Sequence, residues 1–364
     1  MTQVTAKFNA AQGSDFNKTL NQRVNSYFKE NGITRFGNSE MYFKVAFIIV
    51  LYFTPLALFL SGSVSSVWVM ALCWFLMGLG MTGIGLCIMH DANHGSISNK
   101  KSVNSILGYL LNLVGGYHIC WKIQHNVLHH TYTNVHNHDE DIDNKFMRFS
   151  PNQEHKNIHR LQHIYAPFLY SLLTLFWLFA KDFIQINEYS KLGLLEKQGK
   201  TKARALTEAI SLKVAYVAVT LGVVYYVNDF PFWMMLVGFI TMHLITGTIL
   251  AYIFQPAHVQ QDMEFVKLED DNQMVDNCWA VHQLRTTGNF ANSKKLFSWC
   301  IGGLNYQIEH HLFPNICHVH YKKLSPIVKQ TAEEFGITYH HQETFIGAVI
   351  KHSRLLKKLG KNLV

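Results

Sequence analysis

Three groups of histidines stand out in the sequence because their spacing could place several imidazoles on one side of a helix. The groups are His90 and His94; His125, His129 and His130; and Gln307, His310 and His311. Residues three and four positions apart lie on the same face of a helix. Imidazole nitrogens bind zinc, copper, iron and nickel, so the three groups predict a metal site.

His258 is a further candidate ligand, because it follows an apolar segment in the same way that His90 does. The candidates are then eight imidazoles and the amide of Gln307. A structural zinc takes four protein ligands, and a catalytic zinc takes three and a water. The donor set is therefore too large for one ion and predicts two. Two redox metals beside a membrane would favour oxygen chemistry on a lipid.

Polar residues interleaved with the histidines are candidates for orienting them, because a ligating imidazole needs a hydrogen-bonded partner on its second nitrogen. These candidates are Asp91, Asn93, Asn126 and Glu309. Each of them could instead cap a helix end. His136 and His138, which neighbour Asp139, are expected either to support the ligands from outside or to form a polar surface.

Other histidines have a structural interpretation. His155, His159 and His163 also repeat every four residues, but their polar stretch is typical of a solvated helix face. His243 lies within an apolar segment and is expected to hydrogen-bond between helices.

The elements that must position these groups are those of a membrane protein. The 364 residues are 49% hydrophobic and only 15% charged, whereas soluble domains carry about 25% charged residues. Apolar runs at 45–60, 64–89, 206–227 and 230–254 predict four transmembrane helices. Shorter runs at 106–119 and 166–180 fit either interfacial or re-entrant helices or ordinary buried ones.

Short connections at 61–63 and 228–229 predict two helical hairpins, and neither connection contains Lys or Arg. Basic residues occur in both terminal segments, which the positive-inside rule therefore places in the cytosol, together with the segment between the hairpins. The run at 64–89 would extend about 39 Å, beyond a hydrocarbon core of about 30 Å, so His90 and His94 should lie just outside the bilayer. We expect a single all-α membrane domain over 1–364, with a cytosolic helical cap of 90–205 and 255–364 holding the dimetal site.

The motifs HDANHG (90–95), HNVLHHTYTN (125–134) and QIEHHLFP (307–314) resemble the three histidine boxes of membrane fatty-acid desaturases. Glutamine at the start of the third box resembles the front-end branch, whose members insert a double bond between an existing one and the carboxyl end. The second box is most similar to that of bacterial and cyanobacterial acyl-lipid delta-6 desaturases and linoleoyl-CoA desaturases. The resemblance covers roughly residues 42–328.

The resemblance implies an O2-dependent desaturase that introduces a cis double bond into an acyl-CoA or acyl-lipid chain, using two Fe2+ ions. His258 and Gln307 would be additional iron ligands. The catalytic iron ligands from the three boxes would be His90, His94, His125, His129, His130, His310 and His311. The sequence contains no HPGG haem motif. We therefore expect no fused cytochrome b5 domain and a separate electron donor, either a ferredoxin or cytochrome b5. The expected location is a bacterial inner membrane.

Other functions are compatible with parts of the pattern. A membrane hydroxylase or ketolase could use the same diiron site, while a membrane zinc hydrolase would need only about four ligands. A metal transporter would place ionisable residues within the spans, but nearly all histidines lie outside them. The soluble desaturases with Glu-x-x-His pairs are excluded, because no glutamate is followed three residues later by histidine.

Overall fold

The computed structural model describes residues 6–269 and 273–364. The chain divides into two compact units. Unit 1 contains the described residues up to Gly37, together with Gln124–Ala166 and Tyr252–Val364, and unit 2 contains Asn38–Ile123 and Pro167–Ala251. The described structure is mostly helical, as predicted.

Four helical segments are long and apolar enough to cross a membrane, which confirms the predicted number. They are Ser39–Leu60, Val67–Asn93, Lys202–Val227 and Phe232–His258. The first begins six residues earlier than predicted because the Asn38 side chain accepts a hydrogen bond from the Met41 backbone N–H at 3.1 Å. Such a cap satisfies an otherwise unpaired helix N–H. The second and fourth segments continue past the predicted ends at 89 and 254 and include His90 and His258.

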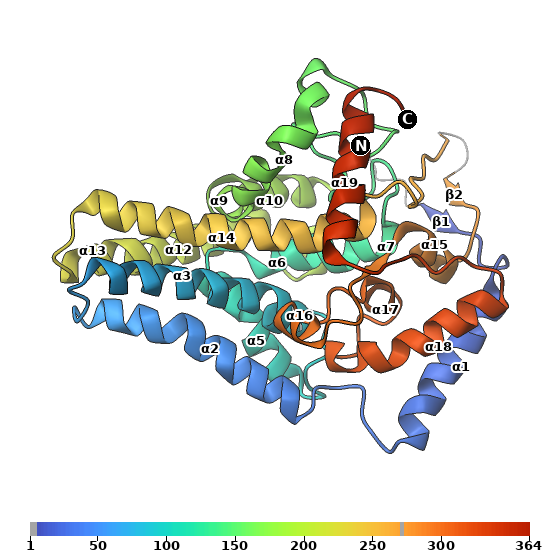
Figure 1. Cartoon of the computed structure of the whole chain (residues 1–364), viewed down its shortest axis with the longest axis horizontal. Coiled ribbons are helices and arrows are strands. Elements are labelled where there is room, and N and C mark those ends of the chain that lie inside the picture. Colours follow the sequence, from blue (N-terminus) through green and yellow to red (C-terminus); the bar gives the residue numbers. More distant parts are fainter. Residues whose placement is uncertain (1–5, 270–272) are drawn as a thin grey trace. The chain divides into compact units, whose positions relative to one another are not determined.

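The first two apolar segments lie side by side in unit 2 (Figure 1). The first is α2 (Ser39–Leu60), and the second consists of α3 (Val67–Gly83), the π-helix η1 (Ile84–Met89) and α4 (His90–Asn93). The close approach of α3 to α2 depends on Gly80, because a Cβ atom there would lie 2.7 Å from the Cβ of Tyr52. A small residue at this position therefore fixes how α3 packs on α2.

The other two apolar segments also use unusual helical turns. One consists of α12 (Lys202–Val217), the π-helix η5 (Ala218–Val223) and α13 (Val224–Val227), and the other is α14 (Phe232–His258). His243 of α14 is fully buried, with its Nδ1 3.0 Å from the Thr174 hydroxyl and its Nε2 3.0 Å from the Tyr216 hydroxyl. This is the predicted interhelical hydrogen-bonding role.

Shorter helices complete unit 2: α5 (Lys101–Leu113), α6 (His118–Trp121), α9 (Leu173–Phe176), η4 (Trp177–Lys181), α10 (Asp182–Lys191) and α11 (Leu194–Lys197). Lys213 of α12 forms a buried ion pair with Asp182 of α10 at 2.6 Å. The predicted apolar run 166–180 falls in a bent pair of helical segments, Asn157–Ser171 and Leu173–Lys191, which meet at 62°.

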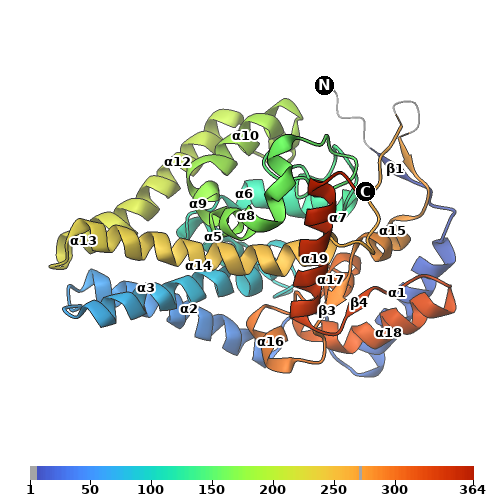
Figure 2. The same ribbon diagram turned by 45° about the horizontal axis from the view of Figure 1, so that its top comes forward.

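Unit 1 is built around two helices that lie side by side in both views (Figures 1 and 2), α1 (Ser14–Glu30) and α18 (Tyr321–Glu334). Phe16 and Leu20 of α1 belong to the same buried core cluster as Leu324 and Val328 of α18. This core also contains residues of α15 (Trp279–Thr286) and α17 (Gln307–Leu312), so it supports α17, the helix that carries the third histidine group.

The remaining helices of unit 1, some of which extend into unit 2, are η2 (Lys122–His129), α7 (His130–Tyr132), η3 (Asn157–Leu161), α8 (Gln162–Ser171), α15 (Trp279–Thr286), α16 (Lys295–Cys300), α17 (Gln307–Leu312), η6 (His318–His320) and α19 (Phe345–Gly360). Two short parallel strand pairs connect distant parts of the chain. Strand β1 (Lys7–Phe8) pairs with β2 (Met274–Val275), and β3 (Asn289–Phe290) pairs with β4 (His341–Gln342).

Candidate metal centre

The second histidine group lies on a π-helical segment, which brings together more of its members than an α-helix would. His125 and His129 belong to the π-helix η2, and His130 begins α7. In a π-helix the backbone hydrogen bonds join residues five apart, so residues i and i+5 lie close to one another. The Nε2 atoms of His125 and His130 are accordingly 3.2 Å apart.

The third histidine group lies on α17, a short helix held firmly from both sides. Its first turn is anchored because the Asn289 side chain accepts a hydrogen bond from the Ile308 backbone N–H at 2.9 Å. Ile308 and Leu312 point into the core cluster. Gln307, His310 and His311 are themselves buried, so the helix presents polar side chains to the interior of the protein.

His258 is tied to the second histidine group through the backbone. Asn134, which ends the second box, donates its side-chain N–H to the His258 carbonyl at 3.0 Å. The His258 ring lies 4.7 Å from that of His129 and 4.7 Å from that of His311, measured between ring centroids. The buried Gln307 side chain lies close to His258, and its Nε2 has no hydrogen-bond partner among the described residues.

Imidazole nitrogens from separate helices converge within unit 1. The Nε2 of His130 is 2.9 Å from the Nε2 of His310, in addition to its approach to His125. Nitrogens bound at about 2.1 Å to one ion at right angles would be about 3.0 Å apart. The observed separations therefore suit ligands of a shared metal ion.

Two overlapping sets of three histidines could each hold a metal ion, since the potential ligand atoms of each set lie within 4.8 Å of one another. The sets are His129, His258 and His311, and His130, His310 and His311. His311 belongs to both. Two adjacent sets are what a dimetal centre requires. Unit 1 contains all of the predicted ligands except His90 and His94, which belong to unit 2.

Four of these rings use their Nδ1 atoms for hydrogen bonds that point away from the cluster. His311 contacts the Gln283 side-chain oxygen at 2.9 Å, and His310 contacts the Tyr321 hydroxyl at 3.3 Å. His258 contacts the Thr286 carbonyl at 3.2 Å, and His129 contacts both Asp139 carboxylate oxygens at 3.1 Å. A ring that donates from Nδ1 keeps the Nε2 lone pair for a metal, so this arrangement fits a metal site.

Asp139 is a fixed anion beside the cluster. It is buried and also accepts backbone hydrogen bonds from Asn134 at 2.9 Å and Asp141 at 3.0 Å. Burial alone lowers the pKa of His129, but the carboxylates of Asp139 and Asp141 outweigh it and raise that pKa to about 9. The same negative charge would stabilise a metal cation bound on the other side of the ring.

His90 and His94 belong to unit 2, where α4 follows the π-helix η1. Their ring centroids are 4.9 Å apart. Asp91 lies with a carboxylate oxygen 3.2 Å from the His90 Nδ1, the position expected of a residue that orients this ring. The Asn93 side chain donates to the Gly108 carbonyl at 3.5 Å, and a Cβ atom at Gly108 would clash with it.

Glu309 is fully buried between Asn289, which donates at 2.8 Å, and Tyr339, which donates at 2.9 Å. Burial raises the pKa of Glu309 to about 7, although both hydrogen bonds act to lower it. These bonds connect α17 to β3 and to Tyr339, two residues before β4. Asn126 lies between the histidines of η2.

Three histidines that repeat every four residues, His155, His159 and His163, do not join the histidine cluster of the described residues. His155 Nε2 donates to the Gly360 carbonyl at 2.8 Å, and the His159 Nδ1 accepts from the Lys156 backbone N–H at 3.1 Å. Among the residues that the structure describes, none of the three belongs to a potential metal-binding group.

Gln283, Tyr321 and Thr286 were not predicted at all, because nothing in their local sequence indicates a histidine partner.

The chain matches the model of the fatty acid desaturase family over residues 65–343, a range that includes all three histidine groups. It is 34% identical over 363 residues to the sn-1 linoleoyl-lipid 6-desaturase of Arthrospira platensis, covering 100% of this chain and 97% of that protein. A protein of the same name from Synechocystis sp. is 33% identical, with 99% of each chain covered. The acyl-lipid (8-3)-desaturase of Physcomitrium patens is 37% identical, covering 98% of this chain and 74% of that protein.

Proposed function

This chain belongs to the fatty acid desaturase family, and we propose that it is a front-end acyl-lipid desaturase that introduces a cis double bond at position 6 of a linoleoyl chain. The single observation that carries the chemistry is the convergence of buried histidine rings in unit 1, with outer hydrogen bonds on four of them. The choice of substrate rests on the two relatives named as linoleoyl-lipid 6-desaturases, to which the chain is similar over its whole length.

We infer that the cofactor is a pair of iron ions. His129, His258 and His311 would contribute to one position, and His125, His130 and His310 to the other, with Gln307 beside His258. His90 and His94 are assigned to the same centre on the basis of the histidine-box resemblance alone. When bound, the irons would supply the oxidising power that removing hydrogen from an unactivated methylene requires.

The residues of the chain have a defined part in this chemistry. Gln283, Tyr321 and the Thr286 carbonyl would hold imidazoles in the tautomer that leaves Nε2 available. Burial of the rings keeps bulk water away from the reacting groups. In the overall reaction, two acyl hydrogens, two electrons and two protons reduce O2 to two waters, and the acyl chain gains one double bond.

Expression in a host that lacks polyunsaturated lipids tests the substrate and the position of the new bond. With linoleate supplied, the chain should produce a lipid with an additional double bond at position 6, found in the glycerolipid fraction and absent with a His311→Ala variant. Mass spectrometry of derivatised double bonds reads the position. A hydroxylated product would instead favour the hydroxylase alternative, and a product confined to acyl-CoA would contradict the proposed lipid carrier.

We also propose that a separate protein delivers the electrons from the cytosolic side, where positive-inside bias places both termini. Purified protein should show no haem absorbance and should turn over only when a ferredoxin or cytochrome b5 is added. Docking of an acidic donor on basic residues is steered by charge, so the rate should fall as salt rises. In sealed vesicles, added donor should support turnover only when the cytosolic face is outside; turnover with a nicotinamide cofactor alone contradicts the proposal.

A further inference from the structure

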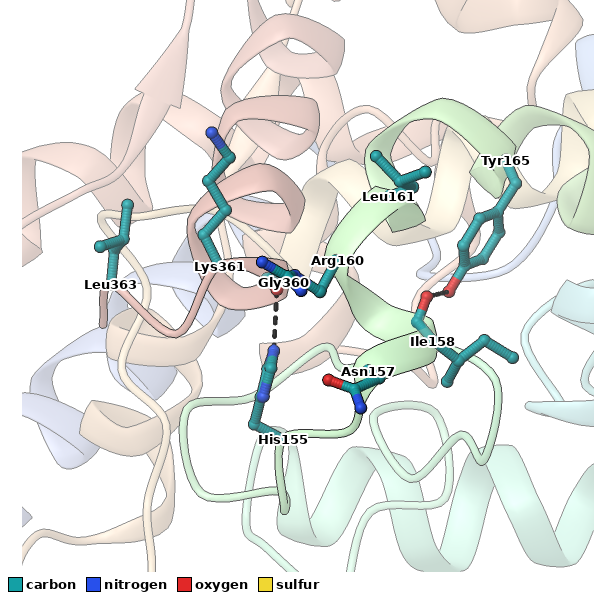
Figure 3. Close-up of a pocket in the computed structure, with 9 residues that line it drawn as sticks. All are labelled: His155, Asn157, Ile158, Arg160, Leu161, Tyr165, Gly360, Lys361 and Leu363. Atoms are coloured by element: carbon teal, nitrogen blue, oxygen red, sulfur yellow. Dashed lines mark hydrogen bonds between the residues drawn. The ribbon is translucent and has the colours of Figure 1, made fainter.

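A groove in unit 1 lies apart from the histidine cluster, between the segment around η3 and the end of α19. It has a volume of about 1030 Å3. Figure 3 shows that Ile158, Leu161 and Tyr165 line one side, while Lys361 and Leu363 lie on the other. Arg160 extends from η3 toward the Gly360 end of α19. None of the proposed iron ligands lines this groove.

The groove is positively charged. Arg160 and Lys361 line it, and Lys357 and Lys358 lie on the last turn of α19. Among the residues that the structure describes, none of these four cations forms an ion pair within 4.0 Å, whereas Lys156, just before η3, pairs with Glu154 at 3.6 Å. Their charge is therefore available to an anionic ligand.

The end of a helix would ordinarily repel an anion, because its terminal carbonyls carry partial negative charge. Here two basic side chains neutralise that effect. His155 donates to the Gly360 carbonyl at 2.8 Å, and the Arg148 guanidinium donates to the Leu359 carbonyl at 3.1 Å. These contacts make the C-terminal end of α19 compatible with a bound anion.

The walls of the groove also present apolar side chains to the outside. Ile158 is 52% exposed, Leu161 is 59% exposed and Leu363 is 67% exposed. Exposed aliphatic side chains beside unpaired cations are typical of a surface that contacts anionic membrane lipids. The same stretch of chain, Asn157–Ser171, is part of the bent pair that is apolar enough to enter a membrane.

We propose that this groove binds the head group of an anionic phospholipid. Arg160 and Lys361 would contact the phosphate, Asn157 would offer its amide to the head group, and the exposed aliphatic side chains would contact the upper part of the acyl chains. A lipid accounts for both the charge and the exposed apolar walls, whereas an acidic electron-donor protein would account only for the charge.

The test uses the full chain, purified in a nonionic detergent and stripped of lipid. It is then offered phosphatidylglycerol and phosphatidylcholine with identical acyl chains, and bound lipid is measured by native mass spectrometry. The wild-type chain should retain phosphatidylglycerol in preference to phosphatidylcholine. Because each basic residue at an anionic surface contributes roughly fivefold to binding, Arg160→Gln with Lys361→Gln should weaken phosphatidylglycerol binding by about 25-fold.

Two matched variants control for charge and folding. Lys322→Gln with Lys323→Gln removes the same charge from exposed positions of α18 and should leave lipid binding unchanged. The exchange Arg160→Lys with Lys361→Arg keeps the charge and should retain the preference for phosphatidylglycerol.

Three outcomes would overturn the proposal. The first is equal retention of both lipids by the wild-type chain. The second is full displacement of phosphatidylglycerol by millimolar inorganic phosphate, which would identify a general phosphate site. The third is unchanged lipid binding in the Arg160→Gln, Lys361→Gln variant with a loss of donor-supported turnover, which would identify a protein-docking surface.

Discussion

Replacing His311 by alanine is expected to abolish desaturation and to remove at least one iron from each chain. His311 is assigned to the same iron position as His129 and His258, so its loss leaves that position with only two of these three histidines. Removing the outer partner of a metal ligand already costs about 10–100-fold, so removing the ligand itself should lower activity by more than about 100-fold. Iron per chain and product formation are measured on the same preparation.

His155→Ala is the matched control, since His155 contacts only a backbone carbonyl at the end of α19 among its described hydrogen bonds. This variant should keep its iron. If His155→Ala lost iron while His311→Ala retained it, the assignment of the ligands would be wrong.

Gln307 should behave differently from the histidines in the same assay. An amide is a weaker metal donor than imidazole, and His258, which lies close to Gln307, remains in place in the variant. Gln307→Ala should therefore lose activity and retain much of its iron, while Gln307→His should retain both ions. Loss of a whole iron from Gln307→Ala would contradict this expectation and show that iron binding depends on Gln307 as it does on the histidines.

Replacing Asp139 by asparagine should weaken iron binding or activity by about 10–100-fold. The change preserves the shape of the side chain but removes the negative charge that lies 3.1 Å from the His129 Nδ1. Without that charge, His129 is a poorer donor and the site is less favourable for a cation. Competition with a chelator of known affinity measures the change in iron binding.

Asp143→Asn provides the control for Asp139, because Asp143 lies in the same acidic loop but is exposed. It should bind iron as the wild-type chain does. Equal losses in the two variants would mean that the net charge of the loop matters, and that the contact between Asp139 and His129 does not.

The sequence was sufficient to predict the four apolar helices and the three histidine groups, because both depend on local patterns. Helix boundaries were less predictable: α2 begins at Ser39 because of the side chain of Asn38, and apolar composition does not reveal such a cap. The approach of His130 to His125 depends on a π-helix, whereas the sequence argument assumed α-helical spacing.

Most hydrogen-bond partners of the histidines could not be predicted from the sequence, for a different reason. Tyr321 is 11 residues from His310, and Gln283 is 28 residues from His311. Helical periodicity relates residues three or four apart, so contacts of this range depend on how α15, α17 and α18 pack. From the sequence, Asp139 stands out only as a neighbour of His136 and His138.

We propose that the histidines hold two irons for the desaturation of an acyl lipid. The metal content of the purified, active chain tests this proposal, measured by inductively coupled plasma mass spectrometry against protein determined by amino-acid analysis. We expect about two irons per chain, because the donor set is too large for one ion, with activity rising in proportion to iron content. One zinc per chain, or full activity in protein depleted of iron, would contradict it.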